Sequence, residues 1–140
     1  MLYKKILLAY DGSDAGQKAL LECRELAEWS KAEMFLVAVM PSTMSFVGLE
    51  GGVYDIELEE RERKKFDGVL QDGLQRLQAL GFAATGEVVD EITKCARKIS
   101  ADLIVVGHKH LGSWTARWWR GSISGALVEH APCSVLCVIL

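Results

Sequence analysis

The sequence lacks an excess of basic residues and any hydrophobic run of membrane-spanning length. Its net charge is −3, with 16 lysine and arginine residues against 19 acidic ones, which disfavours a general nucleic-acid-binding protein. No apolar run reaches the length that a transmembrane helix needs. The N-terminal stretch MLYKKILLAYDGS is too short in its apolar part for a signal peptide, and we expect it to contain a strand. These absences predict a protein that binds neither nucleic acid nor membrane.

A cysteine framework is also missing. None of the four cysteines has CxxC spacing, and none is spaced with a histidine as zinc ligands are. Three of them lie in apolar patterns, where a free thiol behaves as a small hydrophobic group. We interpret all four as reduced packing residues of a cytoplasmic protein, in which disulfides are rare: Cys23, Cys95, Cys133 and Cys137.

What the sequence does contain is the composition of a globular protein. Half of the residues are apolar and a quarter are charged. A length of 140 residues suits one domain with a substantial core. We see no linker, internal repeat or low-complexity tract, so we predict a single domain over residues 1–140.

Strand-like and helix-like patterns alternate along this domain. Strands are expected at 6–9, 33–40, about 82–88 with an interruption at Gly86, 103–106 and 135–139. Helices are expected at 14–30, 55–80, 92–99 and 123–130. This alternation predicts an α/β fold, a doubly wound sheet of five strands with helices between them. The first strand, helix and second strand form a right-handed βαβ unit, which makes these strands parallel.

Three details of the helices are predicted from local chemistry. Asp14 with Gln17 three residues later resembles a capping box at the start of the first helix. Gly81 is expected to end the second helix. His130 shares the apolar face of the last helix and is expected to be a core histidine.

The stretch from Ala101 to Leu140 is the most informative about function. An apolar run ends at Gly107, and the loop after it carries glycines and the cations Lys109, Arg117 and Arg120. A helix is expected to begin where this loop ends, around Gly121-Ser122-Ile123-Ser124. Backbone N–H groups, hydroxyls and the positive end of a helix dipole would meet there, which favours binding of an anion such as phosphate.

A second long loop covers residues 41–54 and mixes small residues with Met44, Phe46 and Val47. It is either a plain connection or a lid over a ligand or a partner, since long loops in compact domains are often functional.

Three segments together resemble the universal stress protein family. They are KKILLAYDGSDAGQKAL, DEITKCARKISADLIVVGHK and GSISGALVEHAPCSVLCVI, and the similarity covers the whole chain. The resemblance implies a parallel sheet in the order 3-2-1-4-5, the fold of adenine nucleotide alpha hydrolase-like proteins, and a homodimer through the last strand. Family members divide into ATP binders and members that bind no nucleotide.

The resemblance also implies the residues of a nucleotide site. Asp11 matches the acidic residue that contacts the adenosine, and Ala9 and Val39 match apolar positions beside the adenine. Positions that hold the ribose and phosphates correspond to Gly107, Gly121, Ser122 and Ser124. From the residues alone, the simpler interpretation is that Asp11 is a turn residue or a helix cap.

The chain departs from the family's ATP-binding motif, which is Gly, two residues, Gly, nine residues, then Gly with Ser or Thr. His110 stands at the second glycine and the loop is one residue longer, unless Gly112 takes that role. Histidine restricts the backbone but adds a phosphate donor. Despite this departure, the resemblance favours a cytoplasmic ATP-binding stress or signalling protein, with Mg²⁺ carried in on the phosphates.

The alternative is a nucleotide-free interaction protein whose tryptophan-rich loop docks an unknown protein partner. Trp114, Trp118 and Trp119 lie in that loop with two arginines, and these residue types are common at protein interfaces. An enzyme is the third hypothesis, at most a slow ATPase, because no general base or metal-holding acid pair accompanies the phosphate loop. His108 and His110 have no third ligand nearby in sequence, so we predict no resident metal.

Overall fold

Five parallel strands form one sheet in the order β3-β2-β1-β4-β5, as predicted. The structure, a computed structural model, describes residues 2–40, 56–109 and 123–140. In chain order its elements are β1 (Lys5–Ala9), α1 (Asp14–Ser30), β2 (Glu33–Val39), α2 (Ile56–Ala79), β3 (Thr85–Val89), α3 (Ile92–Ile99), β4 (Leu103–His108), α5 (Ile123–His130) and β5 (Ser134–Ile139).

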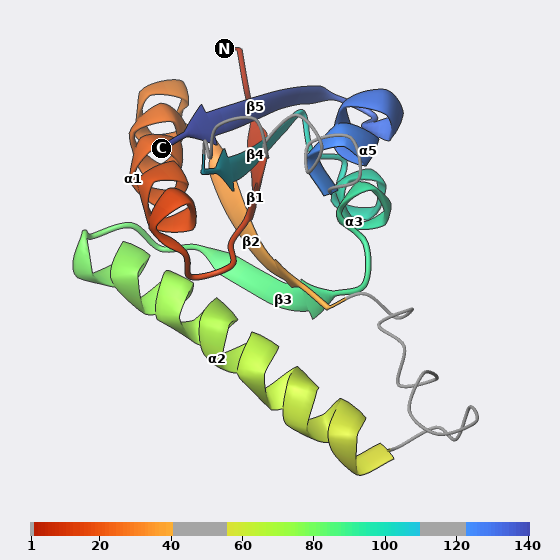
Figure 1. Cartoon of the computed structure of the whole chain (residues 1–140). Helices are drawn as coiled ribbons and strands as arrows, with labels where there is room; N and C mark the ends of the chain where they lie inside the picture. Colours follow the sequence, from red (N-terminus) through yellow and green to blue (C-terminus); the bar gives the residue numbers. More distant parts are fainter. Residues whose placement is uncertain (1, 41–55, 110–122) are drawn as a thin grey trace.

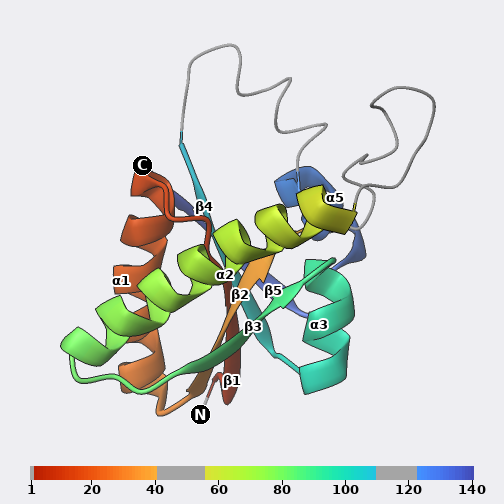
Figure 2. The same ribbon diagram turned by 90° about the horizontal axis from the view of Figure 1, so that it is seen from below.

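Two pairs of helices cover the two faces of the sheet. Figures 1 and 2 show α1 and α2 on one face, and α3 and α5 on the other. Alternate residues of the central strands enter the two cores, as the twofold periodicity of a strand requires. In β1, Ile6 and Leu8 pack under α1 and α2, while Leu7 packs under α3 and α5. A strand buried on both faces has an unbroken apolar run, which is why the sequence showed β1 and β4 clearly.

Helix α2 packs closely on β2 and β3 because two glycines leave room for it. A Cβ on Gly73 of α2 would lie 2.6 Å from Leu36 Cδ2 and 2.9 Å from Tyr10 Cδ2. A Cβ on Gly86 of β3 would lie 2.9 Å from Leu70 Cδ1 of α2 and 2.2 Å from the Leu36 carbonyl oxygen of β2. Gly86 therefore belongs to the strand and allows the close approach of its neighbours. It does not interrupt β3, which corrects the sequence prediction.

The second helix ends at the predicted glycine. Gly81 has a φ of +79°, and its N–H donates to the Gln78 carbonyl at 2.9 Å. The N–H of Phe82 donates to the Leu77 carbonyl at 2.9 Å, which completes a Schellman motif. Since Phe82 takes part in this helix end, β3 begins only at Thr85, three residues later than expected.

The start of α1 differs from the predicted capping box. Ser13 is the N-cap, and its Oγ accepts a hydrogen bond from the Gly16 N–H at 3.0 Å. Asp14 is the first helical residue, and Gln17 donates to the Gly12 carbonyl at 3.2 Å. Gly12 has a φ of +79°, and the turn that it allows places Ser13 in the extended conformation an N-cap needs.

The predicted core position of His130 is wrong. This residue ends α5 and its side chain is exposed, with its Nε2 lying 3.9 Å from Glu129 Oε2. Leu127 of the same helix is buried. Three residues advance the helix by about 300°, so His130 lies about 60° away from Leu127 and in the last turn, where nothing in the described chain covers it.

All four cysteines are free. Cys23 and Cys95 are buried, whereas Cys133 and Cys137 are half-buried. Burial raises the pKa of the Cys23 thiol to about 12, so this residue stays protonated and unreactive. In residues 2–40, 56–109 and 123–140, no helix is both long and apolar enough to cross a membrane.

Candidate functional site

The carboxyl ends of β1 and β4 form the point where the chain leaves the sheet in opposite directions. The two strands are neighbours, with Ala9 paired to Val106. The chain continues from β1 into α1 on one face, and α5, which precedes β5, lies on the other face (Figure 1). In open α/β sheets the crevice at such a switch point is the usual ligand site.

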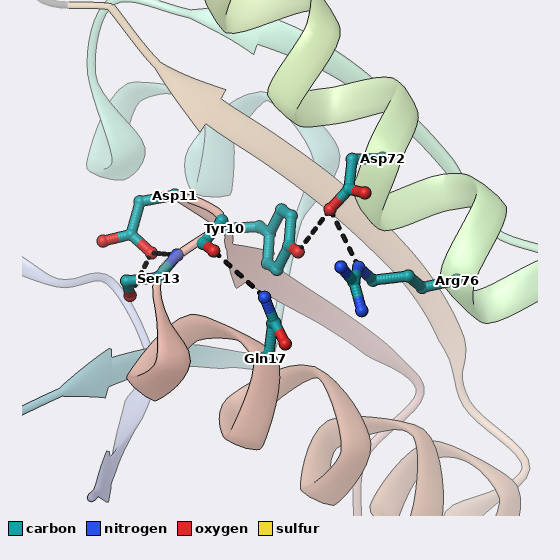
Figure 3. Close-up of polar contacts among 7 residues, drawn as sticks. Tyr10, Asp11, Ser13, Gln17, Asp72 and Arg76 are labelled. Carbon is teal, nitrogen blue, oxygen red and sulfur yellow. Dashed lines mark hydrogen bonds and ion pairs between the residues drawn. The ribbon is translucent and has the colours of Figure 1, made fainter.

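Asp11 lies in the turn that follows β1, and one of its carboxylate oxygens organises that turn. Its Oδ1 accepts from the Ser13 N–H at 3.0 Å and from the Ser13 hydroxyl at 2.6 Å. Figure 3 shows the other oxygen directed away from the turn. Among the residues that the structure describes, no hydrogen bond engages this Oδ2. Asp11 is therefore a turn residue, as the simpler interpretation predicted, and its Oδ2 can still accept a hydrogen bond.

Two glycines allow β4 and the Asp11 turn to meet the first turn of α1. A Cβ on Gly107 would lie 2.4 Å from the Ala15 carbonyl oxygen, and one on Gly16 would lie 2.5 Å from Asp11 Oδ1. The sequence placed Gly107 in the loop after β4, but it lies within the strand and pairs with Val138 of β5. This pairing extends β4 two residues past the apolar run. The importance of Gly16 was missed, although a glycine inside a helix is a signal in itself.

The two residues expected beside an adenine share one face of the sheet. Ala9 and Val39 are half-buried and pack against the core under α3 and α5. Ala9 pairs with Val37, so Val39 lies one step further along the same face of β2. The structure thus brings together Ala9, Val39 and Gly107 at one edge, with Asp11 at its margin.

Other predicted site residues lie outside the described part of the chain. These are His110, Gly112, Gly121 and Ser122, together with the three tryptophans of the same loop and the segment 41–54. Ser124 is the second residue of α5, so its backbone belongs to a helix. Of the positions predicted to hold the phosphates, the structure therefore describes only Gly107 and the beginning of α5.

His108 is an unexpected feature of this edge. It ends β4 and is almost completely buried, pairing with Ile139 of β5. The sequence suggested only one use for His108, as a metal ligand together with His110, and we predicted no such metal site. In the described segments, no group of three histidine, cysteine or acidic side chains is arranged to hold a metal ion.

Tyr10 connects the Asp11 turn to α2. Its hydroxyl donates to Asp72 Oδ2 at 2.7 Å, and Arg76 Nε donates to the same oxygen at 2.9 Å (Figure 3). Burial and the bond to Asp72 raise the pKa of Tyr10 to about 12. The hydrogen bonds from Tyr10 and Arg76 lower the pKa of Asp72. Sequence reasoning missed this link because Tyr10 and Asp72 are 62 positions apart.

An open groove of about 840 Å³ lies at the other end of the sheet. Its walls come from the amino ends of β1, β2 and β3 and from the last residues of α3, and they include Lys5, Phe35, Thr85 and Ile99. None of the predicted site residues lines it. Because ligands of this fold type bind at the carboxyl ends of strands, we place the candidate site at the carboxyl ends of β1 and β4, beside Asp11.

A family model described as the universal stress protein family matches residues 2–138. The chain belongs to the universal stress protein family. A relative named as a putative universal stress protein in Staphylococcus saprophyticus is 30% identical over 147 residues, covering 99% of this chain and 84% of the relative. A solved universal stress protein family structure from Burkholderia pseudomallei is 28% identical, with a TM-score of 0.71 over 98% of this chain and 96% of that one.

Two further universal stress protein structures share the fold and contain nucleotides. One is described as a complex with cAMP and has a TM-score of 0.68 at 20% identity, covering 99% of this chain and 98% of that one. The other, from Archaeoglobus fulgidus, is a complex with dAMP and has a TM-score of 0.65 at 18% identity, covering 99% of both chains. At identities of 20% and 18%, these two structures show only that they have the same fold as this universal stress protein.

Proposed function

We propose that this universal stress protein binds an adenine nucleotide, with ATP as the physiological ligand, at the carboxyl edge of β1 and β4. The observation that carries the proposal is Asp11, whose Oδ1 fixes the turn while Oδ2 stays available at the switch point of the sheet. Solved members of the family in complex with cAMP and dAMP support the same class of ligand.

The chemistry of the sugar end follows from that free oxygen. An ionised carboxylate accepts hydrogen bonds only, and ribose hydroxyls are donors, so Oδ2 of Asp11 is suited to accept from the sugar. Ala9 and Val39 offer apolar surface beside it, which suits the flat face of a purine. Both features lie at one edge of the sheet.

The phosphate end would be held by the loop from Gly107 to Ser122 and by the amino end of α5. The free N–H groups and the dipole of that helix favour an anion. Ser124 and the cations Lys109, Arg117 and Arg120 add hydroxyl and charge by sequence. Magnesium would arrive with the phosphates and neutralise part of their charge. His110 in place of glycine is the feature on which the alternative, a nucleotide-free interaction protein, rests.

The proposed biological role is that of a cytoplasmic stress or signalling homodimer. The strand β5 is the sheet edge through which we propose that two copies pair. Nucleotide occupancy would then be read by a protein partner. Hydrolysis is no part of the proposal.

The proposal is tested first by identifying what the purified protein carries. Heat denaturation followed by mass spectrometry should release an adenine nucleotide, and calorimetry with Mg·ATP should show saturable binding. No released nucleotide and no binding up to about 1 mM, a limit near −4 kcal/mol, would leave the interaction protein as the better account.

Asp11→Asn is the sharpest variant for this site. The amide oxygen can still accept from Ser13 and keep the turn, while the NH₂ group that replaces Oδ2 cannot accept from a sugar hydroxyl. Nucleotide affinity should fall roughly tenfold, since a hydrogen bond to a charged group is worth about 1.5–3 kcal/mol. The matched control is Asp14→Asn, which removes an exposed acid three residues later, in the first turn of α1. It should leave affinity unchanged or slightly improved.

A further inference from the structure

We propose that Tyr10 is a positioning residue for Asp11, because its hydrogen bond to Asp72 fixes the turn after β1 to helix α2. This inference rests on the proposed function of Asp11. It adds a residue that does not itself touch the nucleotide, and it makes α2 part of the support of the binding site.

Tyr10 is well placed for this role by its packing. It is adjacent to Asp11 and only 2% exposed. Its ring lies against Gly73, where an added Cβ would come within 2.9 Å of Cδ2, so the ring fits a surface that α2 shapes for it. Its backbone N–H donates to the Val37 carbonyl at 2.9 Å, although it lies one residue beyond β1. Tyr10 is thus held by β2 through its backbone and by α2 through its side chain.

The bond to Asp72 persists across the neutral pH range. Its acceptor is ionised, because the hydrogen bonds from Tyr10 and Arg76 hold the pKa of Asp72 below its usual value. Its donor is protonated, because burial and the bond to Asp72 raise the pKa of Tyr10 to about 12. A hydrogen bond between a neutral hydroxyl and a carboxylate is stronger than one between two neutral groups. Neither partner therefore changes its protonation state in the physiological pH range, so the bond does not act as a pH switch.

Tyr10 holds the amino-terminal end of the turn, whereas α1 holds its carboxyl-terminal end. Downstream of Asp11, the turn is fixed to α1 through Ser13 and through the bond from Gln17 to the Gly12 carbonyl. Upstream, the side-chain bond of Tyr10 reaches α2 (Figure 3). The carboxylate of Asp11 lies between these two attachments. Loss of this side-chain bond leaves the turn held there only by the ring packing and by the backbone bond to Val37, so we expect the directions in which Oδ2 can point to spread.

The test is Tyr10→Phe, which keeps the buried ring and removes only the hydroxyl. Affinity for Mg·ATP, measured by calorimetry, should fall roughly fivefold as preorganisation of the carboxylate is lost. The matched control is Tyr3→Phe, which makes the same change at a half-buried tyrosine that packs on the same core at the amino end of the sheet. The control should bind as the wild type does, and circular dichroism should show both variants folded.

A double-mutant cycle separates positioning from a general loss of stability. In the Asp11→Asn background, the sugar-facing acceptor is already gone, so Tyr10→Phe should cause no further loss of affinity. A variant that merely loosened the fold would weaken binding equally in both backgrounds. Equal affinity of wild type and Tyr10→Phe, or a loss of the same size in the Asp11→Asn background, would overturn the inference.

Amide hydrogen exchange of residues 11–13 keeps this test distinct from the test of nucleotide binding. If the wild type binds no nucleotide, the proposed function fails, and the exchange rates then decide whether Tyr10 fixes the turn. Faster exchange in Tyr10→Phe than in wild type and Tyr3→Phe supports the attachment to α2. Unchanged exchange overturns it.

Discussion

The hydroxyl of Tyr10 sits where its ionised form is disfavoured. Its ring is buried, and the group that it faces is a carboxylate, so removing the proton would place two negative charges together. Burial is the larger cause of the rise in the pKa of Tyr10 to about 12, and the hydrogen bond to Asp72 is the next. The positive charge of Arg76 lowers the pKa of Tyr10. This effect is smaller than the rise, and the guanidinium is hydrogen-bonded to Asp72.

This environment predicts how stability depends on alkaline pH. The pKa of Tyr10 is higher in the folded protein than the value of 10.0 expected when unfolded. The unfolded state therefore loses its proton first, and the contribution of Tyr10 to stability is present below pH 10 and lost as pH rises toward 12. Absorbance titration of the three tyrosines should show one late component, and Tyr10→Phe should remove it. Removal of the late component by Tyr3→Phe instead would contradict the assignment.

At the scale of elements, α2 contains two glycines with opposite roles. Gly68 is exposed, and an added Cβ would meet nothing within 4 Å. Gly73, five residues later, lies against Leu36 and Tyr10. Glycine disfavours the helix at both positions, but only Gly73 is required for packing.

Gly68→Ala should therefore stabilise the protein, and Gly73→Ala should destabilise it. Alanine favours a helix interior by about 1 kcal/mol over glycine, which is the expected gain at position 68. At position 73 the same gain is outweighed by overpacking of about 1–3 kcal/mol, for a net loss of about 1 kcal/mol. Urea unfolding of both variants measures the two effects. A stabilised Gly73→Ala variant would mean that α2 can move away from β2 at little cost.

Sequence patterns predicted the elements well because hydrophobic periodicity reports burial directly. The strands at 103–106 and 135–139 and the helix at 55–80 were found within one or two residues. What failed was set by contacts between elements or by the geometry of a turn. The end of β4 depends on pairing with β5, the N-cap on the turn at Gly12, and the exposure of His130 on where α5 stops.

The candidate site was only partly predictable for the same reason. Asp11 and Gly107 came from resemblance, since a short polar turn and a glycine are not informative alone. Gly16 and the link from Tyr10 to Asp72 need the packing of α1 and α2 on the sheet, which no local pattern encodes.

At the scale of the whole molecule, β5 is an edge of the sheet that pairs with β4 alone within the described chain. Leu136, Ile139 and Leu140 on and beside it are 38%, 44% and 46% exposed. Lys18 of α1 donates to the Ile139 carbonyl at 2.7 Å, so the end of this edge is already occupied. The rest of the strand has no comparable charged side chain to block pairing with another chain.

An apolar open edge of this kind is stabilised when it pairs with a second copy across a twofold axis. We therefore expect Leu136→Lys to convert a dimeric wild type into a monomer, measured by light scattering across a concentration series. Lysine on an edge strand opposes pairing, because its charge would have to be buried against the second copy. Leu80→Lys is the matched control, because Leu80 is 43% exposed just beyond the end of α2, a helix that packs on β2 and β3. If Leu136→Lys stays dimeric while Leu80→Lys dissociates, the interface lies on the α2 side, and β5 is left without the partner that its apolar surface predicts.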